Sequence, residues 1–286
     1  MSEPACLYAL IEAPRERHED ILERCVAPLS LRWRADPNLD SLFFVRYSEP
    51  VWQVRFRILG EPAWIEGAAR PACEAALAPL RAEGNVSRVR FAAYERELER
   101  YGGPAGMRLA ERLFHLDSLA CLDWLALERS GDARWSRREF ALVMAERFRA
   151  GFEFAPAERR EFYRQGYQWA FDTGVWSEPE RGVLEQRFER NRAGLEALLG
   201  ADPPLTGSAA EHALVDGFRA AAAPVFALVR SGLAEGRIEA HAPHLAWSLA
   251  HMFTNRLAIE PAAEAILRFM ASRLDAGREP QVRGGG

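Results

Sequence analysis

The sequence contains no lysine, and all 37 of its basic residues are arginine. A Schiff-base lysine and a lysine general base are therefore excluded from any mechanism. Cysteine is also scarce: there are four residues and no CxxC pair, which argues against a zinc ribbon or a disulfide framework and is typical of a reducing cytoplasm. The formal net charge of −4 excludes a chain that is basic overall, so we expect no nucleic-acid partner.

Long apolar runs and familiar catalytic motifs are absent as well. No uncharged apolar run approaches about 18 residues, the length that spans a membrane, and no basic segment near the start marks a signal peptide. We therefore expect a cytoplasmic protein with no membrane partner. There is no GxGxxG, P-loop, HExxH or GxSxG motif, which excludes the usual signatures of nucleotide binding, zinc peptidases and α/β hydrolases.

Short alternating runs predict strands that carry arginine. The run Gln53–Leu59 places Arg55 and Arg57 on one face and apolar residues on the other, because side chains alternate across a strand. Neighbouring arginines repel each other unless their face meets an anionic or strongly hydrogen-bonding partner. The runs Phe43–Tyr47 and Val86–Tyr94 repeat the alternation. Four further residues of these strands are predicted to bind substrate: Arg46, Gln53, Arg88 and Arg90.

The order of predicted elements indicates the fold class. An apolar run at Ala5–Ile11 and two stretches of helical spacing complete the order strand, helix, strand, strand, helix, strand. This order is typical of a ferredoxin-like βαββαβ layer. After residue 103 the strand pattern stops and amphipathic helices follow. We predict an α+β fold with a ferredoxin-like sheet subdomain over residues 1–103, a helical subdomain over 104–277 and a disordered tail over 278–286.

One histidine of the helical half is a candidate catalytic residue. His251 lies in an otherwise apolar predicted helix, where Ser248 and Asn255 share its face. A catalytic imidazole and a core histidine satisfied by Ser248 both fit this polar strip, and the spacing does not separate them. His241 and His244 have the i, i+3 spacing of metal ligands but lie at a helix start, so no metal site is predicted.

Two other stretches are candidate walls of a site. A run of alternating charge that contains Arg96 and Arg100 leaves the last predicted strand and ends in Tyr-Gly-Gly, where the backbone can turn sharply. Such a run is by default a solvated face, and the alternative is that its arginines point into a site. Tyr163, Tyr167 and Trp169 cluster in a predicted helix, where they form either a substrate-binding wall or the core face of that helix.

Four motifs in order along the chain resemble a known family. That family is the C-terminal, glutamate-elimination domain of class I lantibiotic dehydratases, and the chain is most similar to the stand-alone forms found in thiopeptide antibiotic clusters. The motifs that carry the resemblance are Phe43-Phe44-Val45-Arg46-Tyr47, Val54-Arg55-Phe56-Arg57, Tyr94…Glu97…Arg100-Tyr101-Gly102-Gly103 and His251-Met252…Asn255-Arg256-Leu257.

The resemblance implies one of two chemistries. The elimination enzymes of the family expel glutamate from a glutamyl ester of serine or threonine and leave a dehydroamino acid. The pyridine synthases perform a formal 4+2 cycloaddition that joins two dehydroalanines of one peptide into a six-membered nitrogen ring, closes a macrocycle and releases the leader peptide. The family's functional positions map onto Arg55, Arg57, Arg96, less directly Arg100, and His251.

One position departs from the family pattern. Gln53 stands where the family usually has a histidine, which counts against elimination, and we therefore favour cycloaddition. Tyr167 and Ser248 are lesser catalytic candidates. The implied partner is a ribosomally made precursor peptide, and no cofactor is implied because neither reaction requires redox chemistry or a metal. A non-catalytic peptide-binding protein is the third interpretation. Substrate binding is further expected of Arg100, Tyr163, Trp169 and Asn255.

Overall fold

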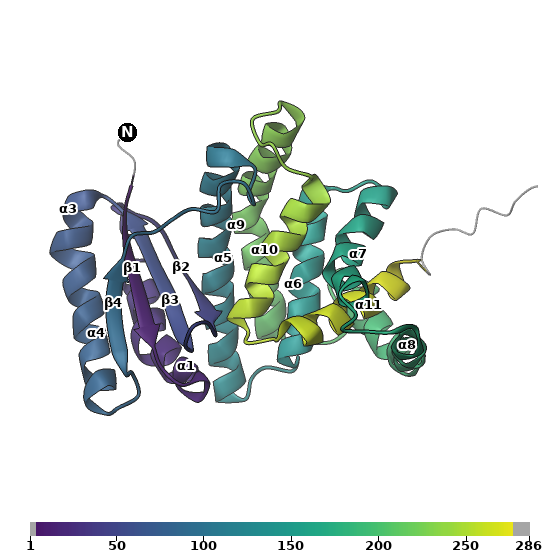
Figure 1. Cartoon of the computed structure of the whole chain (residues 1–286), viewed down its shortest axis with the longest axis horizontal. Helices are drawn as coiled ribbons and strands as arrows, with labels where there is room; N and C mark the ends of the chain where they lie inside the picture. The colour runs from purple at the N-terminus through teal and green to yellow at the C-terminus, as the bar shows by residue number, and fades with distance from the viewer. Residues whose placement is uncertain (1–3, 277–286) are drawn as a thin grey trace, which may run out of the picture. The chain divides into compact units, whose positions relative to one another are not determined.

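Among the residues that the computed structural model describes, 4–276, four antiparallel strands form a sheet in the order β2-β3-β1-β4 (Figure 1). Strand β3 lies between β1 and β2, and β4 pairs with the other side of β1. This is the strand order of the ferredoxin-like layer, so the predicted sheet is confirmed. The strand bounds are β1 Ala5–Glu12, β2 Leu39–Tyr47, β3 Gln53–Gly60 and β4 Arg88–Ala92.

Two helical segments connect these strands and bury their apolar residues. The side chains of Val54, Phe56 and Ile58 on one face of β3 are fully buried. The side chains of Cys25 and Cys73, one from each helical segment, are fully buried, and the two segments contact each other. The helices are α1 (His18–Ile21) and α2 (Ala27–Trp33) after β1, and α3 (Pro62–Trp64) and α4 (Arg70–Ala82) after β3, with π-helical turns at Leu22–Val26 and Ile65–Ala69.

The long helix α5 (Gly103–Ser130) lies along the outer edge of β2 (Figure 1). Nδ1 of His115 is 3.1 Å from both the backbone N and the backbone O of Leu42. The backbone N–H of Phe44 donates to Oγ of Ser118 at 3.4 Å. These side chains satisfy backbone groups that an edge strand otherwise leaves open to another chain.

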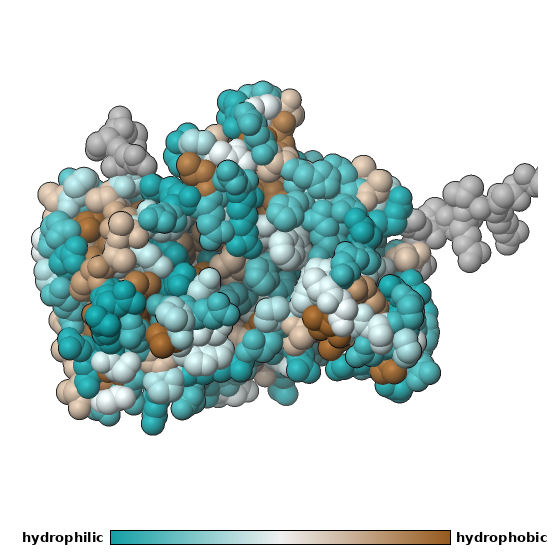
Figure 2. Space-filling view, in the orientation of Figure 1, coloured by the Kyte–Doolittle hydropathy of each residue, from teal (hydrophilic) through white to brown (hydrophobic). Residues whose placement is uncertain are grey.

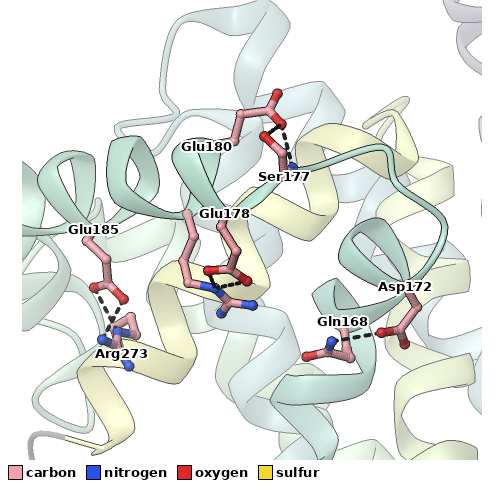
Figure 3. Close-up of polar contacts among 8 residues, drawn as sticks. Gln168, Asp172, Ser177, Glu178, Glu180, Glu185 and Arg273 are labelled. Atoms are coloured by element: carbon pink, nitrogen blue, oxygen red, sulfur yellow. Dashed lines mark hydrogen bonds and ion pairs between the residues drawn. The ribbon is translucent and has the colours of Figure 1, made fainter.

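Helices make up the rest of the described chain. Side-chain caps and ion pairs fix several of them: Figure 3 shows Glu180 accepting from the backbone and hydroxyl of Ser177 at the start of α8, and Arg273 of α11 joined to Glu185 of α8. The bounds are α6 Arg137–Phe152, α7 Pro156–Asp172, α8 Glu178–Leu199, α9 Ala209–Ala234, α10 Ala242–Arg256 and α11 Pro261–Ala276.

These elements form two compact units. Of the described residues, the first unit contains those from 4 to 130 together with Gly217–Glu239, and the second contains Gly131–Asp216 and those from 240 to 276. The partition differs from the predicted subdomains 1–103 and 104–277, because α5 belongs with the sheet it packs against. The predicted tail, 278–286, lies outside the described residues.

Helix α9 contributes residues to both units. Among the described residues it is the helix whose length and composition would suffice to cross a membrane, a test that core helices of soluble proteins also pass.

Candidate functional site

The sheet register places four of the predicted arginines on one face. Leu10 of β1 pairs with Arg55 on one side and with Arg90 on the other. Directly paired residues point to the same side of a sheet, and so do residues two apart on one strand. We call the shared side the arginine face, and its arginines are Arg55, Arg57, Arg88 and Arg90.

The two central arginines of this face contact aromatic rings and leave their polar groups unused. The Arg57 guanidinium lies 4.3 Å from the ring centroid of Tyr8 and 4.7 Å from that of Tyr94, while Arg55 lies 3.4 Å from the ring of Tyr47. Neither guanidinium hydrogen-bonds or ion-pairs with any residue in 4–276, and the Nε of each is buried without a partner. Both groups therefore keep donors for a carbonyl or carboxylate of a ligand.

Arg96 already has a carboxylate partner. Its Nε donates to Oε1 of Glu111 at 2.7 Å, and its guanidinium lies 5.4 Å from the ring of Tyr94. Burial raises the pKa of Glu111, and the Arg96 guanidinium opposes that shift. Burial also raises the pKa of the nearby Cys6 thiol to about 12, which keeps it protonated despite the charge of Arg57. The Arg96 guanidinium is therefore held in place by Glu111 beside Tyr94.

Arg46 lies on the opposite face of the sheet. It pairs in register with Val54, whose side chain is fully buried on the far side from Arg55. The Arg46 side chain is 6% exposed, and its NH2 donates to Glu19 at 3.0 Å. This geometry is that of a structural ion pair, and Arg46 is separated from the arginine face.

The other predicted binding residues of the first unit differ in their exposure and in their hydrogen-bond or ion-pair partners. Gln53 is 2% exposed, and its Nε2 donates to the backbone of Glu49 at 3.1 Å. Arg90 pairs with Glu12 at 3.0 Å, whereas exposed Arg88 has no ion pair within the described residues. Arg100 ion-pairs with the acidic residue three positions before it.

In the second unit, His251 is held by a buried carboxylate. Nδ1 of His251 lies 2.6 Å from Oε2 of Glu264, which is 4% exposed and stands in the first turn of α11. The other carboxylate oxygen accepts from Arg268 at 3.3 Å. Burial alone would raise the pKa of Glu264, but the His251 hydrogen bond and the Arg268 charge outweigh it and hold this pKa below its ordinary value.

This arrangement selects one tautomer of the imidazole. An ionised carboxylate only accepts hydrogen bonds, so Nδ1 of His251 carries the proton that faces Glu264. In the neutral imidazole Nε2 then has a lone pair, and it has no hydrogen-bond partner within residues 4–276. The His251 side chain is 28% exposed, so Nε2 is accessible to a ligand and can accept and return a proton.

An indole covers one side of this imidazole. The rings of Trp247 and His251 stack with centroids 5.4 Å apart and an angle of 13°, and the His244 ring lies tilted at 37° to Trp247 with centroids 5.4 Å apart. Nε1 of Trp247 is buried without a partner. The stack therefore fixes the ring plane of His251 and adds one unused donor beside it.

The three residues of the predicted aromatic wall, Tyr163, Tyr167 and Trp169, have different surroundings. The hydroxyl of Tyr163 donates to Glu146, so this tyrosine serves packing of α7 against α6. Tyr167 packs edge-on against Phe269 of α11 at 5.3 Å, and its hydroxyl has no hydrogen bond within the described residues. Trp169 is partly exposed. Of the two tyrosines, Tyr163 has its hydroxyl engaged and Tyr167 keeps its hydroxyl available.

Ser248 and Asn255 flank His251 on α10 but differ in exposure. Ser248 is fully buried, and Asn255 is partly exposed. The partner that orients His251 is Glu264, which comes from the next helix. Ser248 therefore supports the packing of α10, and Asn255 stays a candidate for ligand contact.

Sequence reasoning missed both buried carboxylates of these clusters. Glu264 lies 13 residues after His251 on a different helix, and Glu111 lies 15 residues after Arg96. Neither spacing is a motif. For Glu264 the sequence gives one weak signal: it is an acidic residue in the first turn of a predicted helix, where the helix dipole favours a negative charge.

Hydrophilic residues cover most of the face seen in Figure 2, and hydrophobic residues form small separate patches there. One cavity of about 190 Å³ in the second unit has none of the predicted site residues in its lining. It is lined by Arg138, Glu139, Leu142, Arg187, Asn191, Gly194, Leu195, Leu198, Ile266, Leu267 and Met270. No group of three metal-ligating side chains occurs within residues 4–276.

Comparisons with known proteins identify relatives of this arrangement. The profile of the family described as "Lantibiotic biosynthesis dehydratase C-term" matches residues 7–274. The subtilin biosynthesis protein SpaB of Bacillus subtilis is 34% identical over 120 residues, which are 42% of this chain and 12% of SpaB.

Two solved structures share the fold along nearly the whole chain. The tRNA-dependent lantibiotic dehydratase MibB from Microbispora sp. 107891 matches 95% of this chain with a TM-score of 0.67 and 22% identity, over 28% of MibB. The pyridine synthase TbtD from thiomuracin biosynthesis matches 96% with a TM-score of 0.67 and 17% identity, over 98% of TbtD. The chain thus spans small parts of SpaB and MibB and nearly all of TbtD.

Proposed function

Since the chain belongs to the lantibiotic biosynthesis dehydratase C-terminal family, we propose that it is an enzyme that matures a ribosomally made peptide by a formal 4+2 cycloaddition. Two dehydroalanines of one precursor peptide would form the central nitrogen ring and the macrocycle, with release of the leader peptide. The observation that carries this proposal is the His251–Glu264 hydrogen bond, because it leaves Nε2 ready for proton transfer.

The reaction requires proton transfers without net oxidation or reduction. The amide between the reacting residues must become its imidic acid, so a proton leaves nitrogen and one arrives at oxygen. After ring closure, water and the leader amide depart, and each departure pairs protonation of the leaving group with loss of a proton from the new ring. A neutral imidazole performs both halves of such transfers, which typically contributes about 10²–10⁴-fold in rate.

His251 takes this role, and Glu264 keeps its tautomer and stabilises the imidazolium that forms transiently. Tyr167 is the second candidate donor because its hydroxyl is unbonded within the described residues. The indole of Trp247 offers a flat wall to the peptide. Positioning of the two alkenes supplies the remaining acceleration, for which about 7–11 kcal/mol is available in well-oriented intramolecular reactions.

Arg55 and Arg57 hold the peptide in this proposal. Their guanidinium groups have planar donor forks, no ion-pair partner and aromatic neighbours that restrict their rotamers. Such groups bind backbone carbonyls or carboxylates with defined geometry. The substrate is therefore a peptide rich in hydrogen-bond acceptors, and cationic substrates are disfavoured.

The same unused guanidinium groups favour a second candidate, glutamate elimination. Arg55 or Arg57 would bind the carboxylate of a glutamyl ester, and expulsion of glutamate with loss of the α proton would leave a dehydroamino acid. The carboxylate-binding capacity of the arginine face is the specific observation in its favour.

Purified protein incubated with two synthetic peptides separates these reactions by mass. We expect a peptide that carries two dehydroalanines to lose its leader and one water and to yield a cyclic product. Loss of glutamate from a glutamylated peptide would support elimination instead. Binding with unchanged mass of both peptides would indicate a non-catalytic peptide-binding protein and overturn both enzymatic proposals.

A further inference from the structure

The two edge strands of the sheet differ in whether their outward backbone groups have hydrogen-bond partners. On β2, side chains of α5 occupy the outward backbone groups of Leu42 and Phe44. On β4, no strand pairs with the outer side within residues 4–276, and the residues alternate between exposed and partly exposed. An edge strand of this kind presents a row of open donors and acceptors to an extended chain.

The alternation of backbone hydrogen bonds along β1 determines which backbone groups of β4 point away from the sheet. The N–H of Ala13 donates to the carbonyl of Trp52 at 3.1 Å, which continues the β1–β3 ladder. Since successive residues of a strand alternate direction, odd-numbered residues of β1 bond toward β3 and even-numbered ones toward β4. Leu10 therefore exchanges hydrogen bonds with Arg90. The N–H and C=O groups of Val89 and Phe91 must point away from β1.

The side chains along this edge have an alternating character. Arg88 and Arg90 stand on the arginine face, and Arg88 has no ion pair within the described residues. Val89 and Phe91 stand on the other face, where the Arg70 guanidinium lies 4.8 Å from the Phe91 ring. A fifth strand would place alternate residues beside arginines and beside apolar groups. The best match is a segment that alternates acidic with apolar residues.

We propose that the β4 edge docks an extended acidic–apolar segment of the peptide substrate, outside the residues that react, as an added strand. This inference rests on the proposed function in taking the partner to be the substrate peptide. Its geometric basis is separate: two outward donors, two outward acceptors and one unpaired arginine at the edge. A second copy of this chain is a poorer occupant, because two such edges would bring arginines together.

A proline at position 89 tests the edge without breaking the ladder. The N–H of Val89 points outward, so Val89→Pro removes an edge donor and blocks strand addition while the bonds between β4 and β1 remain. Val89→Ala is the matched control, since it shortens the side chain and keeps the N–H. Arg88→Glu is a second variant at an exposed, unpaired position that leaves the backbone unchanged.

The probe is a fluorescein-labelled peptide of about nine residues that alternates aspartate or glutamate with leucine or valine. A peptide of the same composition with its acidic residues grouped at one end serves as the control. Fluorescence anisotropy is expected to show binding of the alternating peptide, weakened by about tenfold or more in Val89→Pro and in Arg88→Glu and little changed in Val89→Ala. Circular dichroism verifies that each variant is folded.

Four results of the binding assay would overturn the inference. These are no binding of the alternating peptide by the wild type, equal binding of the grouped peptide, wild-type affinity in folded Val89→Pro, or, if that variant does not fold, wild-type affinity in Arg88→Glu. A dimer that sedimentation detects and Val89→Pro dissolves would assign the edge to a second copy and also overturn it. If the peptide reaction is not observed but the expected binding pattern is, the catalytic proposal is wrong and the docking of an extended segment at β4 stands.

Discussion

The substitution Glu264→Gln removes the negative charge that joins His251 to Arg268 while keeping the side chain's size. Glu264 is 4% exposed and Arg268 is 2% exposed, so the substitution leaves a buried guanidinium without its carboxylate. The amide oxygen still accepts one hydrogen bond, but the amide nitrogen can only donate. When that nitrogen faces His251, Nδ1 must accept, and the proton moves to Nε2.

The expected magnitudes follow from this geometry. Breaking a buried ion pair by removing one partner typically costs about 3–5 kcal/mol. We expect the lower end, about 3 kcal/mol, because the amide retains one acceptor. The rate of the peptide reaction should fall by about 10²–10⁴-fold, since an imidazole protonated on Nε2 cannot take a proton there.

Urea unfolding measures the stability term, and Glu185→Gln is its matched control. Glu185 pairs with Arg273 between α8 and α11, but these side chains are 33% and 45% exposed (Figure 3). The control should cost less than about 1 kcal/mol because exposed ion pairs contribute little.

The pH dependence of folding stability gives a second test of the role of Glu264, because the direction of the change with pH can be predicted. The pKa of Glu264 is lowered in the folded protein, so its stabilising contribution is present above the ordinary glutamate pKa of about 4.3 and is lost as the pH falls through the folded value. The gap between wild type and Glu264→Gln should therefore shrink in acid. A folded Glu264→Gln protein with wild-type stability and wild-type turnover at pH 7 would refute this reasoning.

Three further predictions concern other residues. Gly166→Ala places a Cβ 2.6 Å from Cγ of Arg268 and should destabilise by about 1–3 kcal/mol in urea, whereas Gly182→Ala, which meets nothing within 4 Å, should stabilise by up to about 1 kcal/mol. Burial lowers the pKa of His18 to about 4, so stability should fall by about 3 kcal/mol as the pH drops from about 6.5 to about 4, and His18→Phe should flatten that slope in urea titrations. Arg57→Lys keeps a charge but loses the planar fork between Tyr8 and Tyr94, so kcat/KM for the peptide should fall by about tenfold or more with little loss of stability.

Strand alternation made the sheet predictable. The apolar side of β3 had to be buried, so Arg55 and Arg57 had to share the other side whatever the neighbouring strands were. The order of strands and helices then indicated the ferredoxin-like layer. These inferences needed only local periodicity, which the sequence displays directly.

Relations between elements were not predictable in the same way. Arg46 lies in an alternating run like those of Arg55 and Arg57, but the register with β3 turns it to the opposite face, where it meets Glu19. Glu264 reaches His251 because α10 and α11 are adjacent, a contact that no spacing encodes. The hydroxyl of Tyr163 likewise belongs to Glu146 on another helix. Partners of this kind are set by packing.

The mass of a dehydroalanine-containing peptide after incubation with wild-type protein and with His251→Ala tests the central claim most directly. The account predicts a cyclised, leader-free product with the wild type and unreacted peptide with the folded variant over the same time. Conversion at the wild-type rate by folded His251→Ala would contradict it.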